Sequence, residues 1–216
     1  MEMQMIENML RFPLFQGLSL DDFSKIIPTL KLDFERFDDG NIIVSQGETC
    51  KNIIYIIDGE YDIEMQSKSP RMTFIEHCNR TPYIIEPYNI FTVKRSYERT
   101  YRFTSKGETF SINKETFISR ILTHPIVKSN FINNTCNQLR KLTDIHTSIQ
   151  PMSIEEKIQN LINRLSTEQH STKTIRINMD QLALCIQETR LNVSKVLNKW
   201  HDEGKINLRR SGFLVI

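Results

Sequence analysis

A short run of polar and basic side chains between residues 189 and 195 has the types and spacing needed to read the edges of DNA bases. Arg190 can bond a guanine edge through two N–H groups, and Lys195 can reach a base or a phosphate. If the run is helical, these side chains share a face that the apolar positions leave free. The residues that we expect to contact DNA here are Thr189, Arg190, Asn192, Ser194 and Lys195.

Two short helices with a tight break between them would position these side chains. Asn178 is a suitable N-cap, and residues 179–186 carry apolar side chains on one helical face. Gln187 and Glu188 interrupt that face, and Thr189 can cap the second helix. The pattern predicts a helix-turn-helix, whose second helix enters the DNA major groove. An ordinary pair of helices packed in a core is the alternative.

The sequence around this pair predicts a winged domain. Ser153 and Glu156 form a capping box, and residues 174–177 read as a short strand. Gly204 ends the second helix, and residues 205–208 and 213–216 predict a hairpin. Its turn carries Arg209 and Arg210, which we expect to touch phosphate, although arginines in turns are often only solvated.

The first half of the chain has short strands separated by regular turn signals. Residues 32–37, 42–44, 53–57 and 61–65 alternate or are rich in β-branched residues. Asp58-Gly59 predicts a hairpin turn between the last two of these strands. Strands at this spacing indicate a sandwich or a barrel.

Three glycines carry a more specific resemblance. Gly40, Gly47 within Gln46-Gly47-Glu48, and Gly59 resemble the first half of the double-stranded β-helix of cyclic-nucleotide-binding domains. The second predicted helix of the C-terminal pair resembles the recognition helix of Crp/Fnr transcription regulators. The resemblance implies an α+β chain: a jelly roll over residues 1–124, a dimerisation helix and hinge over 125–150, and a winged helix-turn-helix over 151–216.

The resemblance also implies an effector pocket, at Tyr88, Asn89, Arg99 and Thr100. Tyr88 and Asn89 stand where members that bind cyclic AMP carry a Gly-Glu pair. A tyrosine there obstructs the close approach of backbone to phosphate, and an asparagine carries no charge. We therefore expect no cyclic AMP binding. A pocket for another small anion stays open as an alternative to charges that simply face water.

Residues 125–149 contain no glycine and only the initial proline, which predicts one long helix. A stripe close to a 3.5-residue repeat suits a parallel helix pair, which is how the resembled family dimerises. The predicted dimer interface consists of Phe131, Gln138, Leu142, Ile145 and Ile149. A second stripe, Ile132, Cys136 and Leu139, lies beside it. A helix that packs only within its own chain is the alternative.

The recognition helix departs from the resembled pattern at two positions. Leu191 replaces a residue that is often Glu, and Gln187 replaces the turn glycine. A left-handed Gln187 would cost up to about 1 kcal/mol. We therefore expect a DNA sequence preference unlike that of the better-known members.

Composition excludes several classes of protein. The 216 residues have a net charge of +2, and ten Lys and Arg face seven Asp and Glu from residue 150 onward. No apolar run approaches the roughly 20 residues of a membrane span. No signal peptide is visible, and the four cysteines are not spaced as ligands, so we expect reduced thiols and a cytoplasmic protein. His77-Cys78 cannot alone form a closed metal site, and we expect neither metal nor cofactor.

These observations predict a homodimeric, sequence-specific DNA-binding transcription regulator, not an enzyme. Its expected partners are double-stranded DNA, a second copy of the chain and RNA polymerase, with an unidentified effector. The alternative is an interaction or scaffold protein whose helix-turn-helix no longer meets DNA.

Overall fold

The computed structural model describes residues 9–26, 30–146, 152–167 and 171–216. Their buried apolar side chains form two separate clusters. The first lies inside the N-terminal β-structure and includes Phe12, Tyr55 and Phe110. The second lies under the C-terminal helices and includes Trp200 and Phe213.

The N-terminal part includes the short helices η1 (Pro13–Phe15) and α2 (Leu20–Ile26). A capping box starts α2, because Asp22 N donates to Ser19 Oγ (3.1 Å) and Ser19 N donates to Asp22 Oδ2 (2.9 Å). The elements that follow are β1 (Leu32–Phe37), β2 (Ile42–Val44), β3 (Asn52–Asp58), β4 (Tyr61–Lys68), β5 (Arg71–Cys78), β6 (Tyr83–Ile84), η3 (Pro87–Ile90), β7 (Thr100–Phe103), β8 (Gly107–Asn113), α3 (Lys114–Thr116) and η4 (Phe117–Ile121).

All the paired strands are antiparallel, and they form two sheets. One has the order β1-β8-β3-β6 and the other the order β10-β11-β9-β5-β4-β7-β2. The four-stranded sheet and strands β2, β7 and β4 of the other sheet enclose the first core, which is the layered jelly-roll architecture expected from the sequence. Strands β5, β9, β10 and β11 contribute to the second core.

The turn at Asp58-Gly59 is not a hairpin, so that prediction was wrong. β3 lies in the four-stranded sheet and β4 in the seven-stranded one, so the turn carries the chain from one sheet to the other. Gly59 has φ +110°, and a Cβ on it would lie 2.8 Å from the Cα of Gly107. The glycine is required for this close approach, and Asp-Gly alone does not reveal which strands it joins.

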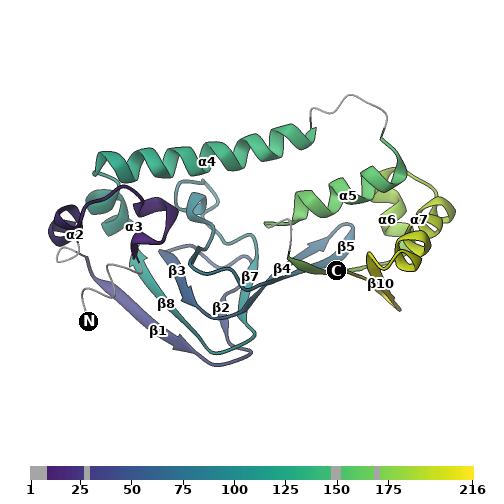
Figure 1. Ribbon diagram of the computed structural model, residues 1–216, viewed down its shortest axis with the longest axis horizontal. Coiled ribbons are helices and arrows are strands. Elements are labelled where there is room, and N and C mark those ends of the chain that lie inside the picture. Colours follow the sequence, from purple (N-terminus) through teal and green to yellow (C-terminus); the bar gives the residue numbers. More distant parts are fainter. Residues whose placement is uncertain (1–8, 27–29, 147–151, 168–170) are drawn as a thin grey trace.

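The long hairpin of the chain is instead β4–β5, paired from Tyr61↔Cys78 to Lys68↔Arg71. The outer edge of β5 pairs with β9 (Thr172–Ile177), from Met72↔Ile177 to His77↔Thr172. A single sheet therefore runs from the N-terminal β-structure into the C-terminal part, and Figure 1 shows the hairpin reaching across. Met72 and Phe74 of β5 belong to the second core.

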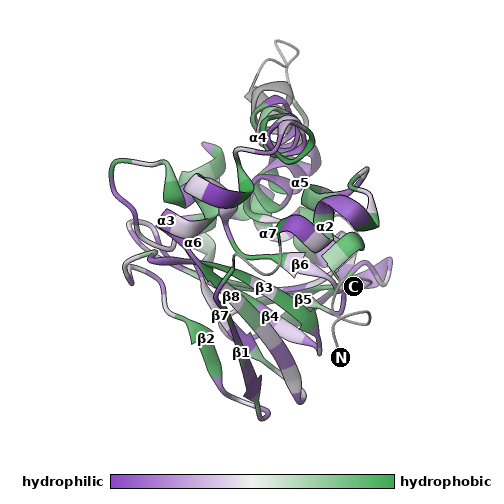
Figure 2. Cartoon of the chain, turned by 90° about the vertical axis from the view of Figure 1, so that its left-hand side faces the viewer, coloured by the Kyte–Doolittle hydropathy of each residue, from purple (hydrophilic) through white to green (hydrophobic). Residues whose placement is uncertain are grey.

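Helix α4 (Pro125–His146) begins at the predicted proline. Its first turns cover the first core: Val127 is fully buried, and Asn130 Nδ2 donates to the carbonyls of Leu14 (3.1 Å) and Gln16 (2.8 Å). α4 extends beyond this core toward the C-terminal helices (Figure 1). Seen end-on above the sheets, it carries both hydrophilic and hydrophobic residues (Figure 2). No helix among the described residues is long and apolar enough to cross a membrane.

The C-terminal part is the predicted winged helix-turn-helix. It consists of α5 (Ile154–Leu165), β9, α6 (Met179–Ile186), α7 (Arg190–Asp202), β10 (Ile206–Arg209) and β11 (Gly212–Val215). The capping box of Ser153 and Glu156 starts α5. Val193 and Leu197 of α7 are fully buried against the other helices. The fold class predicted from the sequence is confirmed.

Candidate nucleic-acid interface

The break between α6 and α7 sets the direction of the second helix. Asn178 caps α6, its side chain accepting from Gln181 N at 2.8 Å. Gln187 ends α6 with φ 55° and ψ 51°, the left-handed conformation that usually favours glycine. Glu188 N donates to Ala183 O at 2.9 Å, which closes the helix end. Gln187 therefore has the strained conformation that the sequence suggested, and the hydrogen bonds at this helix end offset its cost in free energy.

Thr189 begins α7 as predicted, its Oγ1 accepting from Asn192 N at 3.3 Å. Arg190 and Lys195 are exposed, and Asn192 and Ser194 are half-buried. The predicted DNA contacts therefore occupy the first turns of α7, away from the buried stripe. Leu191 is 65% exposed on the same turns. The helix thus presents basic, polar and apolar groups to its surroundings.

Arg190 has a partner that was not anticipated from the sequence. Its Nη1 lies 3.4 Å from Oδ2 of Asp180, at the start of α6, and the two side chains are 68% and 69% exposed. An exposed pair of this kind contributes roughly 0–1 kcal/mol. The pair orients the Arg190 guanidinium in the free protein. Arg190 can exchange Asp180 for another partner at a small cost in free energy.

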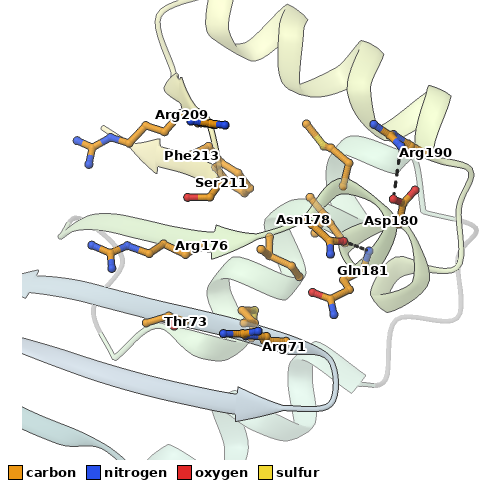
Figure 3. Close-up of a pocket in the computed structure, with 16 residues that line it drawn as sticks. Arg71, Thr73, Arg176, Asn178, Asp180, Gln181, Arg190, Arg209, Ser211 and Phe213 are labelled. Atoms are coloured by element: carbon orange, nitrogen blue, oxygen red, sulfur yellow. Dashed lines mark hydrogen bonds and ion pairs between the residues drawn. The ribbon is translucent and has the colours of Figure 1, made fainter.

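A cleft of about 480 Å³ lies between the wing, β5 and the start of α6. Its basic lining comes from several elements: Arg71 of β5, Arg176 of β9, Arg190 of α7, and Arg209 and Arg210 of the wing. In Figure 3, Arg176 of β9 and Arg209 of β10 extend in the same direction from the two sides of β11, whereas Arg190 lies across the cleft beside Asp180. The structure thus brings three predicted DNA contacts together with two further arginines.

The electrostatics of this cleft favour a polyanion. Within the described part of the chain, no ion pair joins Arg71, Arg176, Arg209 or Arg210 to a carboxylate. Asp180 is the acidic residue in the lining, and it is paired with Arg190. The positive end of the α6 dipole adds to the same field. The strand alternation around Arg176 could have revealed its exposure, but nothing in the sequence predicts that β5 brings Arg71 beside it.

The predicted effector residues do not converge on one cavity. Asn89 is 2% exposed and lines a cavity of about 310 Å³, whose lining does not include Tyr88, Arg99 or Thr100. Tyr88 Oη donates to Glu98 Oε2 at 3.4 Å, and Thr100 Oγ1 accepts from Gln46 N at 2.9 Å. Arg99 stands out because its Nη1 is buried without a hydrogen-bond partner.

Glu86, which sequence reasoning missed, organises this region. It is 4% exposed, and its backbone is left-handed (φ 36°) immediately before η3. Its Oε2 accepts from the Asn89 side chain and from Glu98 N (2.8 Å), and its Oε1 accepts from Tyr101 Oη (3.5 Å). Burial raises the pKa of the Glu86 carboxyl to about 7. This carboxyl joins η3 to the segment that leads into β7.

Of the five residues of the predicted dimer interface, only Phe131 has a described side chain. The Phe131 ring lies 5.3 Å from that of Phe91 and packs against the first core, so it faces its own chain. Phe131 is only half-buried, so its place in the interface stays a prediction. The side chains of Gln138, Leu142 and Ile145, and the whole of Ile149, lie outside the described residues. Among the described side chains of α4, the exposed apolar ones are Ile126, Ile132 and Leu139, with Cys136 also exposed.

No three His, Cys, Asp or Glu side chains of the described ranges are grouped to hold a metal ion. His77 is engaged otherwise: Nδ1 lies 2.7 Å from Asp62 Oδ1, and Nε2 lies 3.2 Å from Thr174 Oγ1. The bond to Asp62 raises the pKa of His77. This side chain therefore links β4, β5 and β9.

No protein-family model and no curated protein sequence matches the chain. Several solved structures match the chain in fold. The catabolite activator protein of Thermus thermophilus matches with a TM-score of 0.54 at 17% identity, over 95% of this chain and 94% of that one. The sensor domain of the transcriptional regulator DNR from Pseudomonas aeruginosa matches with a TM-score of 0.51 at 16% identity, over 68% of this chain and 99% of the domain. The chain therefore has the fold of Crp/Fnr regulators, N-terminal β-domain and C-terminal winged helix included.

Proposed function

We propose that this chain is a sequence-specific DNA-binding transcription regulator that acts as a homodimer. One observation carries the proposal: a capped α7 exposes Arg190 and Lys195, and Arg190 lines the same cleft as the arginines of the wing. α7 enters the major groove, where Arg190 leaves Asp180 and bonds the O6 and N7 of a guanine. Lys195 lies further along the same helix and contacts a base or a phosphate.

Leu191 contributes to the DNA preference. It is 65% exposed on the turn that also carries Arg190. An apolar side chain at this place packs on the C5-methyl group of thymine, whereas a Glu would accept from cytosine. The preferred half-site therefore contains a thymine where better-known relatives read a cytosine.

The wing supplies contacts that do not depend on sequence. Arg209 and Arg210 are exposed at the turn between β10 and β11. Guanidinium groups form paired hydrogen bonds with phosphate oxygens, so these two residues fix the register of the domain on the duplex.

Homodimerisation is proposed through α4. Ile132, Cys136 and Leu139 are exposed at spacings of four and three residues, which place them along one side of the helix. Two copies related by a two-fold axis would present two recognition helices to half-sites about 34 Å apart. A contact with RNA polymerase stays a prediction.

The N-terminal β-domain is proposed to sense a small anion other than cyclic AMP. The supporting observation is the buried Nη1 of Arg99, which has no hydrogen-bond partner in the described structure. A buried donor of this kind costs roughly 1–3 kcal/mol when unsatisfied, and an anionic ligand would remove that cost. Thermal unfolding in the presence of single anions, with Arg99→Gln as control, tests this part separately.

The test of DNA recognition compares wild-type protein with Arg190→Ala on a randomised duplex pool. Wild type should enrich one motif, and Arg190→Ala should cost roughly 1–3 kcal/mol and lose preference at one base pair. Uniform weakening on every sequence would mean that Arg190 contacts phosphate. An interaction or scaffold protein would enrich nothing.

A further inference from the structure

We propose that Arg71, on the hairpin of the N-terminal β-domain, binds the DNA sugar-phosphate strand in the arginine-lined cleft. The DNA-binding surface would then be built from both halves of the chain rather than from the winged helix alone. The inference rests on the proposed function, because it names a further contact within the same complex.

Strand register places Arg71 at this surface. Thr73 of β5 stands opposite Arg176 of β9, and Arg176 stands opposite Gly212 of β11. Gly212 in turn stands opposite Arg209 of β10. Alternate residues of a strand share a face, so Arg71 lies on the same face of the sheet as Thr73 and Arg176. Arg71, Arg176 and Arg209 are all exposed, and all three line the cleft.

Gly212 keeps the surface open between the arginines. A Cβ at this position would lie 1.9 Å from the carbonyl oxygen of Ile175, so no side chain fits there. Arg209 and Arg176 therefore flank a position without a side chain, and Figure 3 shows the two extending alongside each other. An extended chain of phosphates can lie across such a surface without displacing side chains.

Charge identifies the occupant as a polyanion. Four arginines of the lining form no ion pair with a carboxylate of the described ranges, and Asp180 is engaged by Arg190. A single small anion would neutralise one or two of these groups. A DNA strand carries one charge per about 3.4 Å along the helix axis, so several arginines can each meet a phosphate. The cleft also adjoins α7, which places it on the side of the domain that faces the duplex.

The contact would couple DNA binding to the position of the N-terminal β-domain. Arg71 reaches the cleft because β5 pairs with β9 over six residue pairs, from Met72↔Ile177 to His77↔Thr172. Any state in which the hairpin leaves β9 removes Arg71 from the DNA-facing surface. By thermodynamic linkage, DNA then favours the state in which the two strands are paired.

The test measures binding of full-length protein to a mixed-sequence duplex of about 30 base pairs over a range of salt concentrations. Arg71→Ala should bind about tenfold more weakly on every sequence, and its salt slope should be smaller by about one unit for each phosphate that the variant no longer neutralises. Arg71→Lys should keep the slope, because it retains the charge. Arg36→Ala, which removes an exposed arginine of β1 in the other sheet, should bind as wild type does.

The outcomes separate the two claims. If wild type binds and Arg71→Ala matches Arg36→Ala in affinity and slope, this inference is wrong while the proposed function stands. If wild type leaves the duplex free at low salt, the proposed function fails and the Arg71 contact fails with it. Circular dichroism establishes that each variant is folded, and Arg71→Gln, which keeps most of the side-chain stem, answers the same question should the alanine variant unfold.

Discussion

The carboxylate of Glu76 on β5 lies 4.0 Å from the ammonium of Lys173 on β9, and both side chains are buried. Glu76 Oε2 also accepts from the N–H (2.8 Å) and hydroxyl (2.7 Å) of Thr167, and its Oε1 accepts from Ser171 Oγ (2.6 Å). A charged side chain of the N-terminal hairpin is therefore satisfied by the C-terminal part. This pair joins the N-terminal and C-terminal halves of the chain where β5 and β9 pair in one sheet.

Replacing Glu76 should break this connection. Glu76→Ala removes the carboxylate that faces buried Lys173 and accepts from the N–H and hydroxyl of Thr167, which costs roughly 3–5 kcal/mol in the free energy of unfolding. Urea denaturation measures the loss. Glu35→Ala, an exposed carboxylate of β1, is the matched control and should change stability by less than about 0.5 kcal/mol. Equal effects of the two variants would show that the Glu76 contacts do not join the halves.

Removing Asp180 should strengthen DNA binding. Its carboxylate holds Arg190 at 3.4 Å in the free protein and would repel phosphates that enter the cleft. Asp180→Asn removes both effects, and its affinity for duplex DNA should rise up to about fivefold, since an exposed pair contributes no more than about 1 kcal/mol. Asp202→Asn, at the far end of α7, controls for the change in net charge. Weaker binding by Asp180→Asn would mean that the pair prepares Arg190 for DNA.

The carboxyl of Glu86 should make stability depend on pH. Its folded-state pKa of about 7 exceeds the ordinary value of 4.5, so the folded protein holds a proton that the unfolded chain has already released. The contribution of Glu86 to stability therefore falls as pH rises from about 4.5 to about 7, by an amount on the order of 3 kcal/mol. The stability difference between wild type and Glu86→Gln should shrink or reverse across this window.

The same comparison separates the effect of Glu86 on stability from that of His77. His77 also has a raised pKa, and its contribution is likewise lost as pH rises, but it is present in both proteins. Parallel pH profiles of stability for wild type and Glu86→Gln would contradict this prediction, because they would show that Glu86 binds its proton equally in the folded and unfolded protein.

Ile132 offers a test of the proposed dimer. It is 49% exposed on α4, and a carboxylate there would be buried and unpaired in a two-fold helix interface. Ile132→Glu should shift the native mass spectrum from dimer to monomer without loss of helix content. Ile118→Glu, at an exposed position of η4, should leave the dimer intact. An unchanged dimer in Ile132→Glu would move the interface off this face.

Short-range patterns in the sequence predicted the helix caps, because a cap depends only on residues that are close together in the chain. The caps at Ser153, Asn178 and Thr189 could be predicted because each one requires only a side chain near its own helix start. The left-handed conformation of Gln187 was expected because Gln187 stands where the resembled family has the turn glycine. These features set where α7 begins and which of its side chains are exposed.

Long-range pairing could not be predicted in the same way. Asp58-Gly59 has the composition of a hairpin turn but joins two sheets, because the close approach of Gly107 is set by a distant segment. Phe131 fits a coiled-coil repeat, yet its ring packs beside Phe91. Arg71 reaches its place in the cleft through β5–β9 pairing, and no local pattern encodes that pairing.

The salt dependence of DNA binding by the wild-type protein tests the central claim most directly. A dimer that places Arg71, Arg209 and Arg210 of each copy on phosphates makes six such contacts, so log affinity should fall with log salt with a slope of about −5. Tight binding at low salt with this slope is the predicted result. No binding at low salt, or an affinity that does not change with salt, would contradict the account.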